Sequence, residues 1–254
     1  MYLKTVGIIS FFVAVFTANA VGGESKMDFS SIWQGQYVGI AAGASYSKAD
    51  PDVMLQQTTY FNSQDSDQLN PLASENLDQT DFSGGLLWGF AFQKDHFVFG
   101  IEADVSMADF EEEYSTGDIS YTSLPTRDFS ITTRVKSDWA ASLRLRLGYA
   151  WKDSLFFASA GPSWTRFDYR FIFTDGLPES ADVDKDEVTQ GWTAGVGYEK
   201  KLGKAWSMRT EWLYAYYGDI IDTDSFLSTN SADGFTHDLD YETHSFRLCI
   251  IRSF

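Results

Sequence analysis

A strict alternation of apolar and polar residues runs through several short segments of this chain, and it restricts the fold more than any other sequence feature. In residues 97–107, every odd position from Phe97 to Met107 is apolar, whereas Glu102 and Asp104 lie between them. Successive side chains of a β-strand point to opposite faces of the sheet. The pattern therefore predicts a strand with one apolar face and one charged face.

Seven further segments show the same period, three of them clearly and four more weakly. Together with the first, they predict about eight strands, the smallest number with which a membrane barrel closes. The facing of one weaker segment, residues 155–173, stays open, because Pro162 interrupts it and suggests a bulge or a distortion. The clear segments are residues 82–92, 141–149 and 206–216, and the weaker ones are residues 37–48, 155–173, 189–200 and 241–254.

The composition contains many large apolar rings in a chain that is polar on average. Aromatic residues make up 17% of the sequence, although the mean hydropathy is -0.23. After residue 20, no stretch approaches the roughly 18 apolar residues that a membrane helix needs. A membrane crossing is therefore predicted to use strands, which turn the rings towards lipid and the polar face inward.

The connections between the predicted strands alternate in length. Residues 94–96, 152–153 and 202–204 are tight polar turns, and the segments between them are long. This alternation favours an all-β fold, an eight-stranded antiparallel up-and-down transmembrane β-barrel with short periplasmic turns and four long external loops. A soluble β-sandwich or a lipocalin would not explain such a regular alternation of short and long connections. The predicted loops are residues 49–80, 110–130, 174–188 and 218–240.

The N-terminal segment has the features of an export signal. Lys4 is followed by the apolar residues 6–16 and by Ala18-Asn19-Ala20, a small-x-small cleavage site. The alternative is an uncleaved membrane anchor, but the apolar stretch is short for a span. We expect residues 1–20 to be a signal peptide and residues 21–254 to form the barrel domain in the bacterial outer membrane.

Charge is distributed unevenly along the chain. The formal net charge is -17, and neither the first nor the last predicted loop contains a Lys or an Arg. The external rim is therefore predicted to be strongly negative, and nucleic acid is excluded as a partner. Cys249 is the single cysteine, so it cannot form an internal disulfide.

The polar faces of the predicted strands would bring charged side chains into a narrow lumen. Isolated buried charges are costly, so we expect these residues to form an ion-pair network that fills the barrel and fixes its register. The alternative is a narrow ion or proton path. The residues are Glu102, Asp104, Arg144, Arg146, Arg209, Glu211 and Arg247.

Many aromatic residues fall near the predicted strand ends, where amphipathic rings settle at the membrane interface. The alternative is ordinary core packing. The predicted interface residues are Trp88, Trp139, Tyr149, Trp151, Trp206, Trp212 and Phe254.

Catalysis, a metal site and a cofactor site are not predicted. Adjacent residues of a strand diverge, so His244 and Ser245 cannot act together. His96 falls in a turn and His237 in a predicted loop, where both are expected to be solvated or to lie in the aromatic girdle. Residues 182–187 resemble the start of a calcium loop, but Glu187 stands where that loop needs Gly.

Three stretches resemble the small porin-like outer-membrane proteins known as outer-membrane immunogenic proteins or major surface antigens. Residues 32–39 resemble the W-x-G-x-Y-x-G opening strand, and residues 190–199 with 206–214 resemble the G-W-T-x-G-x-G-x-E hairpin and its W-S-x-R-x-E-x-L-Y partner. Residues 244–254 resemble the closing H-x-x-R-x-G-x-x-Y-x-F strand, with Cys249 in place of glycine and Arg252 in place of an aromatic residue.

Together, these observations predict a non-enzymatic outer-membrane protein of a Gram-negative bacterium. It would act as a structural component of the envelope and as a surface antigen or adhesin-like scaffold for loops; the alternative is a narrow porin or ion channel. The expected partners are outer-membrane lipids, lipopolysaccharide, the outer-membrane assembly machinery and a host or surface ligand of the external loops.

Overall fold

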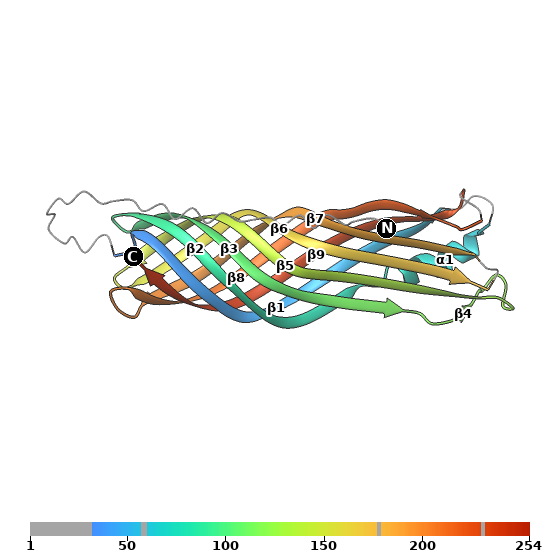
Figure 1. Cartoon of the computed structure of the whole chain (residues 1–254), viewed down its shortest axis with the longest axis horizontal. Helices are drawn as coiled ribbons and strands as arrows, with labels where there is room; N and C mark the ends of the chain where they lie inside the picture. Colours follow the sequence, from blue (N-terminus) through green and yellow to red (C-terminus); the bar gives the residue numbers. More distant parts are fainter. Residues whose placement is uncertain (1–31, 57–59, 177–178, 230–231) are drawn as a thin grey trace, which may run out of the picture.

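The computed structural model describes residues 32–56, 60–176, 179–229 and 232–254. Within them, eight long antiparallel strands form an elongated barrel (Figure 1). No helix of this part of the chain is long and apolar enough to cross a membrane. The predicted signal peptide, residues 1–20, lies outside the described residues and stays a prediction. The strands are β1 (Gly35–Gln56), β2 (Leu77–Lys94), β3 (Phe97–Ser115), β5 (Asp128–Trp151), β6 (Ser154–Asp175), β7 (Ser180–Lys201), β8 (Trp206–Phe226) and β9 (Gly234–Ser253).

Consecutive strands pair along the barrel wall, and two further pairings close the ring. β1 pairs with β9, and β3 pairs with β5. The two-residue strand β4 (Ile119–Ser120) adds to β5, and helix α1 (Ser63–Ala73) connects β1 to β2. Both lie at the end of the barrel opposite to the short turns (Figure 1). The predicted antiparallel eight-stranded barrel is confirmed.

The strands are longer than the sequence indicated. β6 continues to Asp175 and β7 begins at Ser180, so most of the predicted loop 174–188 is strand. β1 likewise extends into the first predicted loop, as far as Gln56, and β9 begins at Gly234, within the last predicted loop. The predicted extents of the four external loops are therefore wrong. Inward and outward side chains still alternate through these segments, but here the apolar side chains point inward and the polar ones point outward.

β6 illustrates this inversion. Near the short-turn end, Phe156 is exposed on the outside and Ser159 is buried inside. Further along the strand, Phe167 and Phe171 are buried inside, whereas Arg170 is exposed outside. We call the first part of the barrel the membrane segment, because its outer surface is a belt of exposed apolar side chains. The second part has charges outside and rings inside, as expected for strands surrounded by water.

The wall of the second part is not a continuous ring. β2 pairs with β3 only over residues 85–94 and 97–106, and β7 pairs with β8 only over 192–201 and 207–216. Beyond these pairs, the described strands form two four-stranded sheets, β2-β1-β9-β8 and β3-β5-β6-β7. We call this part the external sandwich. Its core is one apolar cluster between the sheets, which includes Leu69 of α1.

The two seams of the external sandwich leave strand edges that could pair with other chains. β3 and β8 are bulged at these edges, between Met107 and Phe110 and between Tyr217 and Ile221. On the edge of β7, Lys185 and Glu187 lie opposite the buried residues Tyr169 and Phe167. Bulges and inward-pointing charges of this kind disfavour edge-to-edge association.

The structure also decides the facing of residues 155–173. Odd-numbered residues from Leu155 to Phe173 point inward. The register between β6 and β7 runs without a break through Pro162, which pairs with Trp192. The irregularity between β5 and β6 lies elsewhere, between Ser137 and Ala140.

The length of the strands can be tested by proteolysis of intact cells. We expect a nonspecific protease to cut within residues 122–126, which lie outside helices and strands, and to spare residues 182–187 of β7. Mass spectrometry of the fragments identifies the cuts. Efficient cleavage within residues 182–187 would show that this segment is a loop and contradict the external sandwich.

Candidate functional site

The interior of the membrane segment holds a cluster of buried ion pairs centred on Glu102 of β3. Glu102 accepts hydrogen bonds from Arg144 of β5 at 2.6 Å and from Arg209 of β8 at 2.7 Å. Both guanidinium groups are fully buried. Because Glu102 bonds to strands on either side of the lumen, it connects opposite walls of the barrel.

Two further centres extend this cluster along the barrel axis. Arg247 of β9 donates to Asp104 at 2.8 Å and to Glu211 at 2.6 Å. Arg146 forms an ion pair with Glu199 of β7 at 2.7 Å, and Arg209 lies 3.0 Å from the same carboxylate. All seven residues predicted for the lumen are therefore brought together.

Glu199 is a member of the cluster that the sequence analysis missed. The predicted set held three carboxylates and four arginines, and Glu199 brings it to four of each. A charge imbalance in a buried set is itself a signal, because an unpaired buried arginine is very costly. Glu199 also alternates inward on its strand, directly opposite Arg209. We call the eight residues the lumen network.

Two aromatic rings and two glycines support the lumen network. Arg146 stacks 3.7 Å from the centre of the Phe157 ring, and Tyr37 donates to Glu102 at 2.8 Å. A Cβ atom on Gly89 would lie 2.3 Å from the Tyr37 ring, and one on Gly197 would lie 2.3 Å from the Phe157 ring. Only glycine leaves room for these rings, which in turn hold the arginines by cation–π contacts.

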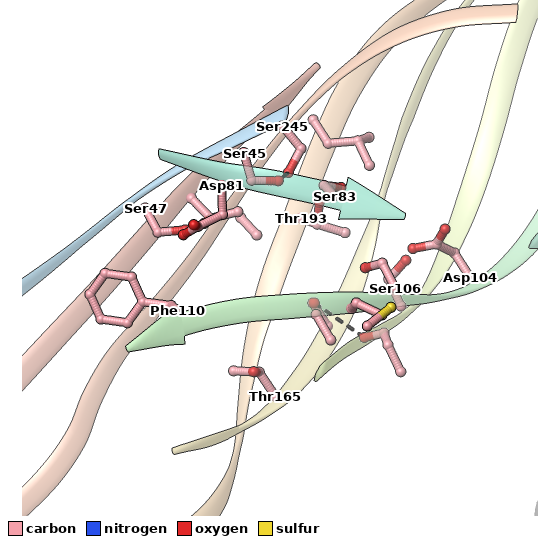
Figure 2. Close-up of a pocket in the computed structure, with 18 of the residues that line it drawn as sticks. Ser45, Ser47, Asp81, Ser83, Asp104, Ser106, Phe110, Thr165, Thr193 and Ser245 are labelled. Atoms are coloured by element: carbon pink, nitrogen blue, oxygen red, sulfur yellow. Dashed lines mark hydrogen bonds between the residues drawn. The ribbon is translucent and has the colours of Figure 1, made fainter. Parts of the chain in front are cut away.

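A polar cavity of about 60 Å³ lies between the lumen network and the core of the external sandwich. Figure 2 shows Asp104, a member of the network, and Phe110, a member of the core, on opposite sides of the cavity. Arg247 of the network also lines it. Serine and threonine hydroxyls line much of its wall, among them Ser45 and Ser245, whose oxygens are 2.7 Å apart. The cavity is large and polar enough to hold water.

The predicted interface aromatics occupy different depths of the membrane segment. Tyr149, Trp151, Trp206 and Phe254 lie at strand ends beside the short turns or the C-terminus. Trp139 lies towards the external sandwich and is half-buried. The other two, Trp88 and Trp212, lie about halfway along their apolar rows, so their place at a membrane interface stays a prediction.

The three histidines occupy different environments. His96 lies in the turn between β2 and β3, and His244 stacks on Trp212 outside the barrel. His237 was expected to be solvated or in the girdle, but it is fully buried in the external sandwich. This expectation was wrong because β9 begins before His237, and the strand directs the His237 side chain into the aromatic core.

Two hydroxyls hold the ring of His237. Its Nδ1 lies 3.0 Å from the Tyr169 hydroxyl, and its Nε2 lies 2.8 Å from Ser225 Oγ. Burial lowers the pKa of His237 to about 4, and the carboxylate of Asp224 opposes this shift only in part. The histidine is therefore neutral at physiological pH.

The described residues contain no group of three or more His, Cys, Asp or Glu side chains that could hold a metal ion. Residues 182–187, which resemble the start of a calcium loop, are part of strand β7. Their carboxylates are spread along a strand, whereas a calcium loop curls its oxygens around one point.

Comparison with known proteins agrees with this architecture. Residues 11–248 match the family model of the outer membrane protein beta-barrel domain. The chain belongs to this family. It is 29% identical over 204 residues to the 31 kDa outer-membrane immunogenic protein of Brucella melitensis biotype 1, with 78% of each chain covered. It is 25% identical to the 25 kDa outer-membrane immunogenic protein of Brucella ovis, covering 87% of this chain and 93% of the relative.

Among solved structures, the outer membrane protein OprG from Pseudomonas aeruginosa is similar with a TM-score of 0.48 and 14% identity, covering 87% of this chain and 96% of that one. The family places the protein in the outer membrane, where the apolar belt contacts lipid and lipopolysaccharide. The resemblance to outer-membrane immunogenic proteins is therefore confirmed.

The stability of the lumen network can be tested at Glu199. We expect Glu199→Gln to lower the free energy of unfolding by about 3 kcal/mol, because Arg146 and Arg209 lose a charged partner while they stay buried. Urea unfolding of the protein in detergent or lipid measures this change. Asp186→Asn is the control; it breaks an exposed pair with Arg166 and should cost less than about 1 kcal/mol. Equal effects of the two substitutions would contradict the role of the network.

His237 should make the stability depend on pH. The folded pKa of about 4 lies below the unfolded value, so the unfolded chain binds a proton first as the pH falls. The contribution is present in full above about pH 6.5 and is lost as the pH falls to about 4, by roughly 3 kcal/mol. We expect His237→Gln to remove this slope from the unfolding free energy, whereas His96→Gln leaves it in place. A slope unchanged by His237→Gln would refute the assignment.

Proposed function

We propose that the protein is a sealed, non-enzymatic barrel that anchors a rigid acidic surface scaffold in the outer membrane. The observation that carries the proposal is the presence of two successive obstructions along the barrel axis. The lumen network fills the membrane segment, and the aromatic core fills the external sandwich.

The two obstructions argue against a channel for different physical reasons. In the lumen network, four carboxylates face four guanidinium groups, so a passing ion would have to displace a paired charge. In the external sandwich, Phe167, Phe171, Phe173 and Phe235 are fully buried between the sheets. The cavity of about 60 Å³ lies between these obstructions, so a passing ion would still have to cross both of them.

The chemistry of the described residues supports a non-enzymatic role. Ser225 and His237 form a hydrogen-bonded pair that resembles a nucleophile and its base, but both side chains are buried in the aromatic core. His244 and Ser245 point to opposite faces of β9, and His244 stacks on Trp212. A substrate would reach neither arrangement.

The surface presented to the outside is made of strands more than of loops. Outward carboxylates face one another across β1 and β9: Asp50 lies directly opposite Asp240, and Asp52 lies directly opposite Asp238. This rigid acidic face suits a basic host or surface ligand and gives antibodies a fixed epitope. The assembly machinery is the other expected partner, and it would insert the barrel through the closing strand that ends at Phe254.

A sealed barrel should not conduct. We expect the purified protein to give no stable single-channel conductance in planar bilayers, because both obstructions remain in place at neutral pH. A known porin reconstituted in the same bilayers is the control. Steady conductance that changes with Arg144→Ala or Glu211→Ala would establish the channel alternative and overturn the proposal.

A further inference from the structure

An apolar groove of about 830 Å³ crosses the lipid-facing wall of the membrane segment. Its floor is made of small side chains, Ala158 and Ala160 of β6 and Ala194 of β7. Larger side chains form the two walls, so the groove is an elongated depression in the outer surface. The walls are Phe99, Leu145 and Leu147 on one side and Trp192, Val196, Trp212 and Tyr214 on the other.

An aromatic shelf lies at the end of the groove that faces the external sandwich. The Trp192 ring is 5.4 Å from the Tyr214 ring and 6.5 Å from the Tyr216 ring. Two carboxylates of β9 complete the shelf. Tyr214 donates to Glu242 at 3.0 Å, and Tyr216 donates to Asp240 at 3.1 Å. Ring faces and carboxylates are therefore held together at the upper edge of the lipid-facing belt.

The sheet that carries these carboxylates is acidic on its outward face. Lys48 is the single Lys or Arg on this face in the part of β2, β1, β9 and β8 that belongs to the external sandwich. It forms an ion pair with Asp50 at 2.7 Å and lies directly opposite Glu242 on β9, so this region carries one cation against the carboxylates of Asp50, Asp240 and Glu242. The outward face of the other sheet differs, because it carries Arg134, Lys136, Arg166 and Arg170. The shelf thus belongs to the face that attracts cations.

We propose that the groove and the shelf together bind one phospholipid with an ammonium head group, of the ethanolamine or choline type. An acyl chain occupies the groove over Ala158, Ala160 and Ala194. The ammonium group lies against the rings of Tyr214 and Tyr216, beside Glu242 and Asp240. Aromatic faces combined with carboxylates are the usual recognition elements for such cations.

Two other occupants fit the surface less well. A lipid with a purely anionic head group would bring its phosphate next to Glu242 and Asp240, and like charges repel. A second copy of the barrel docked on the same patch by two-fold symmetry would bring two such acidic faces together. The charge of the shelf therefore selects the ammonium lipid.

Native mass spectrometry of the chain without the predicted signal peptide, folded in detergent, tests this site. Phosphatidylethanolamine, phosphatidylcholine or phosphatidylglycerol with the same acyl chains is added at equal concentrations. We expect one molecule of either ammonium lipid to be retained about tenfold more than phosphatidylglycerol. Glu242→Gln with Asp240→Asn should remove this preference while the groove still accepts acyl chains.

Filling the groove tests the site of the acyl chain. Ala160→Phe should abolish lipid retention, and Ala194→Leu serves the same purpose if the first variant does not fold. Heat-modifiable migration on gels verifies the fold of each variant. The controls are Ala42→Phe on the lipid-facing side of β1 and Asp52→Asn on the acidic face away from the shelf, which should both bind as the parent does.

Three results would overturn the proposal. One is equal retention of all three lipids by the parent protein. Another is unchanged retention in folded groove-filling variants. The third is a protein dimer in place of the lipid adduct, which would assign the patch to a second copy. Conductance measurements are independent of these results, so failure of the lipid site and failure of the sealed-barrel function are distinguishable.

Discussion

The buried charge at Glu102 is the constraint on which the rest of the barrel depends. Its carboxylate bonds to Arg144 and Arg209, which stand on strands that are not neighbours of each other in the ring. A slip of one residue in any of these strands would turn an arginine towards lipid, where it has no partner. The ion pairs therefore select one register and one barrel, and the stacked rings of Tyr37 and Phe157 restrict the arginines further.

Outside the membrane, the same eight strands are in contact with water instead of lipid. Water surrounds the outside, so apolar side chains turn inward and the ring divides into two packed sheets over an aromatic core. The division releases the curvature that a closed barrel of eight strands requires, and it makes room for the rings of residues such as Phe171 and Phe235. Its consequence is four strand edges, and bulges on β3 and β8 and charges on β7 disfavour their association with other chains.

The membrane segment and the external sandwich have complementary roles in the proposed function. In that proposal, the membrane segment anchors the protein and seals the barrel, and the external sandwich presents a rigid acidic surface at a fixed distance from the lipid. The aromatic shelf of Tyr214 and Tyr216 lies at the boundary, where lipid-facing rings meet the first outward carboxylates. Recognition at this boundary would couple the position of the barrel to the chemistry of the surrounding lipid.

The sequence by itself determined the barrel, the strand number and the inward facing of residues such as Glu102 and Arg209, because alternation has a period of two whatever lies around the strand. It did not determine the lengths of the strands or the burial of His237. In the external sandwich the outward residues are charged and the inward residues are aromatic. From the sequence alone such a segment resembles a polar loop, because the second sheet that buries the aromatic residues is not visible there. Nor could it pair Ser225 with His237 or place Tyr214 beside Glu242, since those contacts join residues on neighbouring strands. Only the tertiary structure decided them, because strand register and sheet packing bring distant residues into contact.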